Sequence, residues 1–290
     1  MARSSSGRPF PAPSVPPANS ALTEPRWRSA LSPAATVVSA LFASLFLLFL
    51  LAPVVGLVGT GGASGVSQLA VDAELRAALV LTLVTAMIAT LCAVLGGTPL
   101  AYLLARRAFP GRAVVAAILD LPLLIPHPVA GIALLLVLGR GSNIGQALLA
   151  VGLRVTGTVF GIVCAMLFVA APLYVNGARE AFARVDRRYE AVARTLGDTG
   201  WRAFRRVTLP LSVRGLTTAA IVMWARAVSE FGAIVVLTYN PKVASVLSYD
   251  RFTGYGLSAA LPVAAVLVLL ALAPLIALRA LRQGDERDER

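Results

Sequence analysis

The sequence predicts an all-α fold, a polytopic membrane protein with six transmembrane helices. Of its 290 residues, 58% are hydrophobic and 14% are charged, whereas a soluble domain carries about 25% charged residues. The mean hydropathy is +0.79. The apolar residues form runs of the length that a bilayer crossing needs, about 20 residues, and the basic residues lie almost wholly between these runs. This pattern excludes a disordered chain and argues against a soluble enzyme.

The chain divides into a tail, a membrane domain and a second tail. Residues 1–33 are rich in proline, serine and alanine, a composition that cannot bury enough apolar surface to fold. We expect a disordered cytoplasmic tail over 1–33, a transmembrane permease domain over 34–281 and a charged tail over 282–290. The apolar runs give six expected spans: 34–58, 76–106, 113–138, 154–179, 210–237 and 258–281.

The third expected span contains three prolines and the only histidine. Pro122, Pro126 and Pro128 lack the backbone N–H that a helix interior needs, and His127 lies between the last two. The carbonyls that they leave free are tolerated in a membrane only where neighbouring helices or water satisfy them. This helix must therefore be broken or kinked near its middle.

The basic residues predict the orientation. Six spans place both termini on one side of the membrane. Twenty basic residues fall in the tails and loops of that side, five fall on the opposite side, and Arg226 lies inside the fifth span. Because basic loops stay in the cytoplasm, both termini are expected to be cytoplasmic. The net charge of +12 is then a topology signal and contact with the inner leaflet, and no nucleic-acid partner is expected.

The longest cytoplasmic loop, about 183–210, joins the fourth span to the fifth. Asp186 can cap a helix at its start, and Gly197 suits the left-handed stop after its last turn. Three apolar residues share one face of this helix: Tyr189, Val192 and Leu196. The loop is thus expected to hold a compact, rigid helix on the cytoplasmic face.

A second short helix is expected to follow in the same loop. It can start near Thr199, with Trp201 and Phe204 on its buried side. Pro210 then fits the first turn of the fifth span. An Arg-rich hairpin that touches lipid headgroups is the alternative interpretation of the whole loop.

The spacing in this loop resembles the EAA loop of ABC-transporter permeases. The usual form of that loop is Glu-Ala-Ala, three residues, Gly, nine residues, Ile-x-Leu-Pro. The corresponding residues are Ala191-Val192-Ala193, Gly197 and Val207-Thr208-Leu209-Pro210. The glutamate is Glu190, one place upstream, so that Ala191 takes its usual position. In that family the loop docks into a groove on a separate ATPase subunit and carries its closure into the membrane. The resemblance therefore implies a set of ATPase-coupling residues: Glu190, Ala191, Ala193, Gly197 and Pro210.

Other segments extend the resemblance over most of the chain. Residues 97–106 resemble the end of the second helix of these permeases, and residues 120–131 resemble their proline-rich third helix. Residues 225–233 are close to the Gly-Glu-Phe-Gly-Ala run of sulfate, molybdate and tungstate permeases, with Ser229 in place of the first glycine. Residues 239–257 most resemble tungstate/molybdate permeases. The implied fold is that of a type I ABC importer permease in a prokaryotic plasma membrane.

The resemblance implies an ATP-driven, binding-protein-dependent importer of an oxyanion, tungstate or molybdate. The expected partners are a second copy of the chain, two cytoplasmic ATPase subunits and an external substrate-binding protein. A phosphate-binding loop needs a lysine, and the only lysine, Lys242, lies on the outer side. We therefore expect ATP and Mg to bind the ATPase, with no catalytic, cofactor or metal site in this chain. Cys92 and Cys164 are interpreted as packing residues.

Five residues are candidates for the translocation pathway: Pro126, His127, Arg226, Ser229 and Glu230. Arg226 and Glu230 are four apart on one expected helix face and can pair, which offsets part of the cost of burying each charge. Alternatively, Arg226 presents its charge to an anion. His127 can line the pathway or be satisfied by a neighbouring carbonyl.

Functions other than that of an ABC importer make different demands on the sequence. A sulfate or thiosulfate permease of the same family is the nearest alternative. A secondary transporter should show an internal repeat and intramembrane carboxylates that bind coupling ions, and the sequence shows no repeat. A membrane-embedded enzyme would need a cluster of catalytic side chains, which one histidine does not supply.

Overall fold

The computed structural model describes residues 33–288, with side chains from 34 to 272. This range is helical and contains no strand, as expected. The predicted N-terminal tail, 1–33, lies almost wholly outside it. The helices are α1 (Pro33–Val71), α2 (Ala73–Arg106), α3 (Arg112–Leu124), α4 (His127–Leu138), α5 (Asn143–Ala150), α6 (Val159–Arg184), α7 (Arg187–Thr195), α8 (Gly200–Ala203), the π-helical η2 (Phe204–Thr208), α9 (Leu209–Val228), α10 (Gly232–Leu237), α11 (Ala244–Tyr255) and α12 (Leu257–Asp288).

Several of these helices can cross a membrane. Within the described residues, four are long and apolar enough: Ala34–Val71, Ala73–Arg106, Val159–Arg184 and Gly200–Val228. The pair α3 and α4 would add a fifth span, bent by 115°. The apolar part of α12 that is described covers only Leu257–Leu272. A multi-pass membrane protein is confirmed, and the count of six spans stays a prediction.

The chain forms two compact units that meet inside α1. The first ends at Leu51, and its described part is an apolar helix. The second, Ala52–Arg290, holds all the other helices. Within the second unit, Gly61 and Gly65 of α1 lie against the backbone of α12 near Leu261 and Pro262. Small residues of this kind let membrane helices approach closely.

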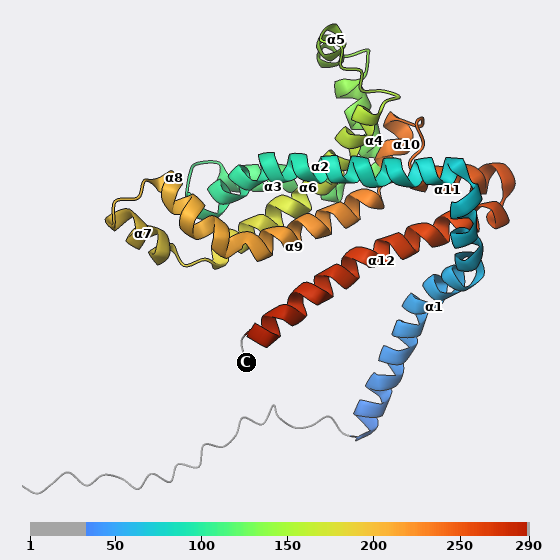
Figure 1. Ribbon diagram of the computed structural model, residues 1–290, viewed down its shortest axis with the longest axis horizontal. Helices are drawn as coiled ribbons and strands as arrows, with labels where there is room; N and C mark the ends of the chain where they lie inside the picture. Colours follow the sequence, from blue (N-terminus) through green and yellow to red (C-terminus); the bar gives the residue numbers. More distant parts are fainter. Residues whose placement is uncertain (1–32, 289–290) are drawn as a thin grey trace, which may run out of the picture. The chain divides into compact units, whose positions relative to one another are not determined.

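The core of the second unit is built by α2, α6 and α9, which run side by side (Figure 1). Small side chains make this packing tight. A Cβ on Gly97 of α2 would lie 2.9 Å from Val175 Cγ2 of α6, and the neighbouring Thr98 hydroxyl lies 2.7 Å from the Tyr174 hydroxyl. A Cβ on Gly177 of α6 would lie 2.7 Å from Ala219 Cβ of α9. The three helices therefore form one closely packed body.

The third span is broken where the prolines predict. Helix α3 stops at Leu124, and Ile125 takes an extended conformation with φ −83° and ψ 142°. A residue before proline is driven out of the helical region, so Pro126 ends α3, and α4 begins at His127. Asp120 of α3 accepts a hydrogen bond of 2.7 Å from the Asn176 amide of α6. This bond between helices fixes the first half of the broken span.

The fifth span ends earlier than predicted. The sequence suggested a helix over 210–237, whereas α9 ends at Val228 and the short α10 begins at Gly232. Glu230 lies in the break and its carboxylate accepts a hydrogen bond of 2.9 Å from the Ala233 N–H, which caps α10. The prediction that Arg226 and Glu230 share one helix face was therefore wrong, because Glu230 follows the end of α9.

Helix α11 joins α2 through a polar network at the opposite end of the bundle from α7 and α8 (Figure 1). The Lys242 ammonium lies 2.6 Å from Asp250, and Arg251 lies 2.7 Å from Asp72 and 3.1 Å from Glu74. Hydrogen bonds from Lys242 and then from the Tyr239 hydroxyl hold the pKa of Asp250 below its ordinary value. The ionised carboxylate thus fixes the loop before α11.

This network predicts a pH dependence of stability. A carboxyl whose pKa is lowered on folding stabilises the protein above its unfolded pKa, about 3.9, and the contribution is lost as pH falls through the folded value. Thermal unfolding of detergent-solubilised protein should therefore show a lower Tm for Asp250→Asn at neutral pH, and a difference that shrinks below about pH 4. Glu180→Gln, which removes a carboxylate that is 67% exposed and lies outside the network, controls for net charge. An Asp250→Asn difference that persists unchanged at low pH would contradict this.

Candidate functional site

Helix α7 folds as its sequence predicts. The Asp186 carboxylate accepts a hydrogen bond of 2.9 Å from the Arg188 N–H at the helix start. At the other end Gly197 has φ +96°, a conformation that costs other residues about 1–2 kcal/mol. The Asp198 N–H then donates to the Ala193 carbonyl at 3.0 Å, which is the Schellman arrangement. Both ends of α7 are therefore fixed.

Glu190 points from α7 into the bundle and contacts two membrane helices. Its carboxylate accepts hydrogen bonds from the Tyr102 hydroxyl of α2 at 3.2 Å and from the Thr208 hydroxyl before α9 at 2.5 Å. The Arg106 Nε of α2 lies 3.2 Å from the same carboxylate. Charge-assisted hydrogen bonds of this kind are the stronger ones. Glu190 thus binds α7 to the ends of α2 and α9.

Aromatic packing and one further bond strengthen this joint. The Tyr102 ring packs edge to face against Phe182 of α6, with ring centres 5.6 Å apart, and against Phe204 of η2 at 4.7 Å. Arg187 of α7 donates a hydrogen bond of 3.2 Å to the Ala105 carbonyl. The start of α7, the end of α2 and the segment before α9 therefore form one rigid element.

The opposite side of the loop presents apolar side chains to the exterior. Tyr189 and Val192 of α7 and Leu196 at its C-cap are 58%, 56% and 83% exposed, on the shared face that the sequence predicts. Trp201 is 68% exposed, so the prediction that it lies on the buried side of α8 was wrong. It stacks on Phe204 with ring centres 5.5 Å apart, while Phe204 packs inward. The loop therefore carries an exposed apolar face on a rigid support.

The loop joins the fifth span without an interruption. Thr199 caps α8, whose last residue leads directly into η2 and then α9. Pro210 lies in the first turn of α9, as predicted. Ala191 and Glu190 both line a groove between the end of α2 and the helices α7 and α8, and Ala193 is half-buried. The predicted coupling residues therefore lie in α7, in the turn that follows it and in the first turn of α9.

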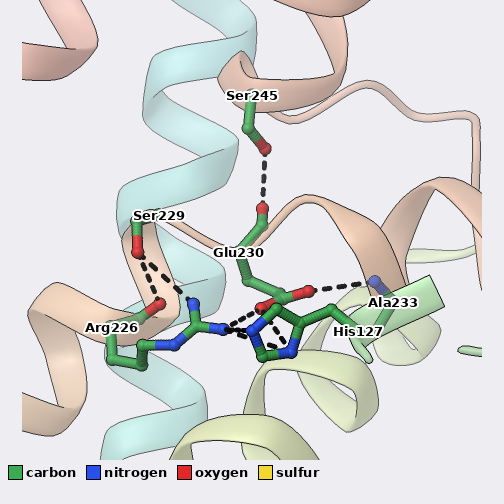
Figure 2. A network of polar contacts seen from close by, with 6 residues as sticks. All are labelled: His127, Arg226, Ser229, Glu230, Ala233 and Ser245. Atoms are coloured by element: carbon green, nitrogen blue, oxygen red, sulfur yellow. Dashed lines mark hydrogen bonds and ion pairs between the residues drawn. The ribbon is translucent and has the colours of Figure 1, made fainter. Parts of the chain in front are cut away.

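Arg226, Glu230 and His127 form a second polar cluster, at the breaks of two spans (Figure 2). Arg226 Nη2 lies 2.7 Å from Glu230 Oε2 and 2.6 Å from His127 Nε2. The Glu230 side chain is fully buried, whereas Arg226 and His127 are 22% and 41% exposed. A buried carboxylate must be paired, and here one guanidinium neutralises it while presenting its remaining surface outward.

The cluster is held from every side. The Glu230 carbonyl accepts a hydrogen bond of 2.7 Å from Ser245 of α11, and its carboxylate caps α10. Ser229 accepts from Arg226 at 3.4 Å and donates to its carbonyl. Gly232 lies against His127, where a Cβ would come within 2.7 Å. Pro126 caps α4 at its start and places His127 there. The predicted pathway residues thus lie together, and the expected Arg226–Glu230 pair forms.

The partners of Glu190 were not found from the sequence. Tyr102 and Arg106 are four residues apart at the end of α2, more than 80 positions before Glu190, and Thr208 belongs to the matched motif, 18 positions after it. Neither signal identifies a contact with Glu190. No group of three or more metal-binding side chains was found in the described part of the chain.

These features define the class of the protein. The sequence pattern of the family described as "Binding-protein-dependent transport system inner membrane component" matches residues 97–284, and the chain belongs to this family of ABC-importer permeases. Among its relatives, the molybdate/tungstate transport system permease protein WtpB of Thermococcus kodakarensis is 44% identical over 198 residues, which cover 68% of this chain and 75% of that protein. The sulfate transport system permease protein CysT of Escherichia coli is 29% identical over 248 residues, 84% of this chain and 90% of that protein.

The fold matches a solved structure of the same class. A bacterial ABC transporter involved in the import of the acidic polysaccharide alginate contains a chain that superposes with a TM-score of 0.63 at 18% identity. The match covers 87% of this chain and 95% of that one. At this identity the likeness concerns the fold.

The buried pair predicts a non-additive effect on stability. Removing one partner of a buried ion pair typically costs about 3–5 kcal/mol, whereas replacing both by apolar residues costs far less. Unfolding in detergent should show a large loss for Glu230→Leu and a smaller loss for the Arg226→Met/Glu230→Leu double variant. Equal losses in the single and double variants would contradict the pairing.

Proposed function

We propose that this chain is the membrane-spanning permease subunit of an ATP-driven, binding-protein-dependent importer of tungstate or molybdate. The relatives named as molybdate/tungstate permeases support the substrate. The importer would contain two copies of this chain, two cytoplasmic ATPase subunits that bind ATP and Mg, and an external binding protein. Both termini and α7 would face the cytoplasm, and the chain itself would not hydrolyse ATP.

The observation that carries the proposal is that α7 has two different faces, one exposed and apolar and one bound to the membrane helices. Its outward face, Tyr189, Val192 and Leu196, is apolar and exposed, as a docking surface on a partner requires. Its inward face is bound through Glu190 to α2 and to the start of α9. A displacement of α7 by an ATPase would therefore move two membrane helices together rather than bend a loop.

The proposed pathway passes the cluster at the breaks of α3/α4 and α9/α10. Arg226 offers a partly exposed guanidinium whose charge is already balanced by Glu230. A site that balances its own charge can meet an oxyanion without holding it too tightly to release it, as conduction requires. His127, Ser229 and Pro126 would shape this point of the pathway. Access would alternate between the two sides of the membrane as the ATPases close and open.

The docking role predicts the effect of a charge on the exposed face. Leu196→Glu places a carboxylate in an apolar contact, and such burial of an unpaired charge is strongly unfavourable. We expect the variant to fold with an unchanged Tm but to lose copurification of the ATPase subunit of the same importer, and to lose ATP-driven uptake in liposomes. Val151→Glu changes an apolar residue outside the loop that is also strongly exposed, 71% against 83% for Leu196, and this variant should copurify normally. Full ATPase binding by Leu196→Glu would refute the docking role.

The substrate assignment is tested by uptake into liposomes that contain the whole complex and its binding protein. Tungstate or molybdate should accumulate only with internal ATP, and excess sulfate should compete weakly. Strong competition by sulfate would favour the sulfate-permease alternative, which the relative CysT supports. Uptake that follows an ion gradient and ignores ATP would instead indicate a secondary transporter and overturn the proposal.

A further inference from the structure

A groove of about 940 Å³ lies between the end of α2 and the helices α7 and α8. Its lining has two chemically different parts. One part is apolar and comes from α2 together with Trp201, Phe204 and Leu209. The other part is basic and lies where α2 ends and α7 begins. The groove is therefore amphipathic along its length.

The basic part carries more positive charge than the protein itself neutralises. Arg106, Arg107, Arg187 and Arg194 line it, and Glu190 is its only acidic residue. The Glu190 carboxylate is already engaged by two hydroxyl groups and by Arg106 Nε. Within the described residues, Arg107 and Arg194 take part in no ion pair. The groove thus offers a net positive surface that suits an anion.

Arg106 gives this surface a buried donor. Its side chain is only 6% exposed, and within the described residues its Nη2 has no hydrogen-bond partner. Its Nε lies close to Glu190 but makes no aligned hydrogen bond. A buried guanidinium with unused N–H groups is costly unless a ligand accepts from them. Phosphate oxygens match the fork of guanidinium donors well.

The apolar part selects a ligand with hydrocarbon chains. Leu95 and Leu103 of α2 line it and are 77% and 48% exposed. They are eight residues apart on a helix that is apolar enough to span a membrane, so the wall extends about 12 Å along the helix at 1.5 Å per residue. A free oxyanion has no apolar part that could pack against this surface, whereas the acyl chains of a lipid can lie along it.

We infer that this groove is a binding site for one anionic phospholipid. Its phosphate would lie against Arg106, Arg107 and Arg194, and its acyl chains would follow Leu95 and Leu103. Basic pockets between membrane helices commonly recognise anionic headgroups in this way. This inference rests on the proposed function only for the side of the membrane on which α7 lies. The lipid site does not depend on which substrate is transported. Because the lipid would touch α7 beside Glu190, it would support the joint between α7 and α2.

Native mass spectrometry of the full-length, delipidated protein tests the site. The protein is titrated with phosphatidylglycerol or phosphatidylcholine. The Arg107→Gln/Arg194→Gln variant removes two charges and leaves the Arg106–Glu190 contact intact. We expect one phosphatidylglycerol to bind in preference to phosphatidylcholine, and the variant to bind it about 25-fold more weakly, from about fivefold for each charge. Arg112→Gln/Arg188→Gln removes two arginines outside the groove and should bind like the wild type.

The apolar wall has its own matched pair of variants. Leu95→Gln changes the wall, and Leu91→Gln makes the same change one turn earlier on α2, outside the groove. Only Leu95→Gln should weaken lipid binding. If the Arg107→Gln/Arg194→Gln and Arg112→Gln/Arg188→Gln variants weaken lipid binding equally, the lipid responds only to the overall positive charge and the inference is overturned. Equal binding of phosphatidylglycerol and phosphatidylcholine would overturn it as well.

Two further outcomes identify a different occupant. If inorganic phosphate displaces phosphatidylglycerol and binds alone with the same dependence on Arg107 and Arg194, the ligand is a soluble oxyanion and the lipid assignment fails. If Leu95→Cys in a Cys92→Ala/Cys164→Ala background, which removes both native cysteines, forms a disulfide between two copies of lipid-free protein, a second chain covers the groove. Retention of one phosphatidylglycerol with neither result would support the inference.

Discussion

The contacts of Glu190 are the constraint on which the rest of the loop depends. One carboxylate receives the hydroxyls of Tyr102 and Thr208 and lies beside Arg106, so it connects α7 to the end of α2, more than 80 positions earlier, and to the segment just before α9. Its burial directs the opposite, apolar side of α7 outward. A hydrophobic face that is exposed on a flexible loop would collapse onto the nearest surface, whereas here the caps and the Glu190 joint hold it open.

Local signals in the sequence were sufficient for much of the fold. The caps of α7, the left-handed turn at Gly197 and the break before Pro126 each follow from one or two residues and the backbone chemistry that they impose. The end of the fifth span could not be predicted in this way. Residues 229–237 are apolar enough to continue a helix, and the chain breaks where Glu230 joins a cluster with Arg226 and with His127, which lies 99 positions before Arg226.

At the candidate site, too, the features that follow from local sequence patterns were predicted, and those that depend on tertiary contacts were missed. The spacing from Ala191 to Pro210 is a local pattern, so it located the loop and predicted the class of its partner. The inward direction of Glu190 and the outward direction of Trp201 depend on the packing of α2 and α6 against the loop. Phe204, rather than Trp201, takes the inner position because it meets the Tyr102 ring. Such choices between neighbouring aromatic residues require tertiary contacts, which no single sequence displays.

The π-helical turn η2 sets the rotational phase between the loop and the fifth span. Its Leu209 N–H donates to the Phe204 carbonyl, five residues earlier, so this turn holds one residue more than an ordinary α-turn. Because each residue advances a helix by about 100°, deleting one residue here would rotate the whole α7–α8 element by about a quarter of a circle around the α9 axis. The number of residues in η2 therefore matters as much as their identity. An insertion or deletion within it would turn an otherwise intact loop in the wrong direction.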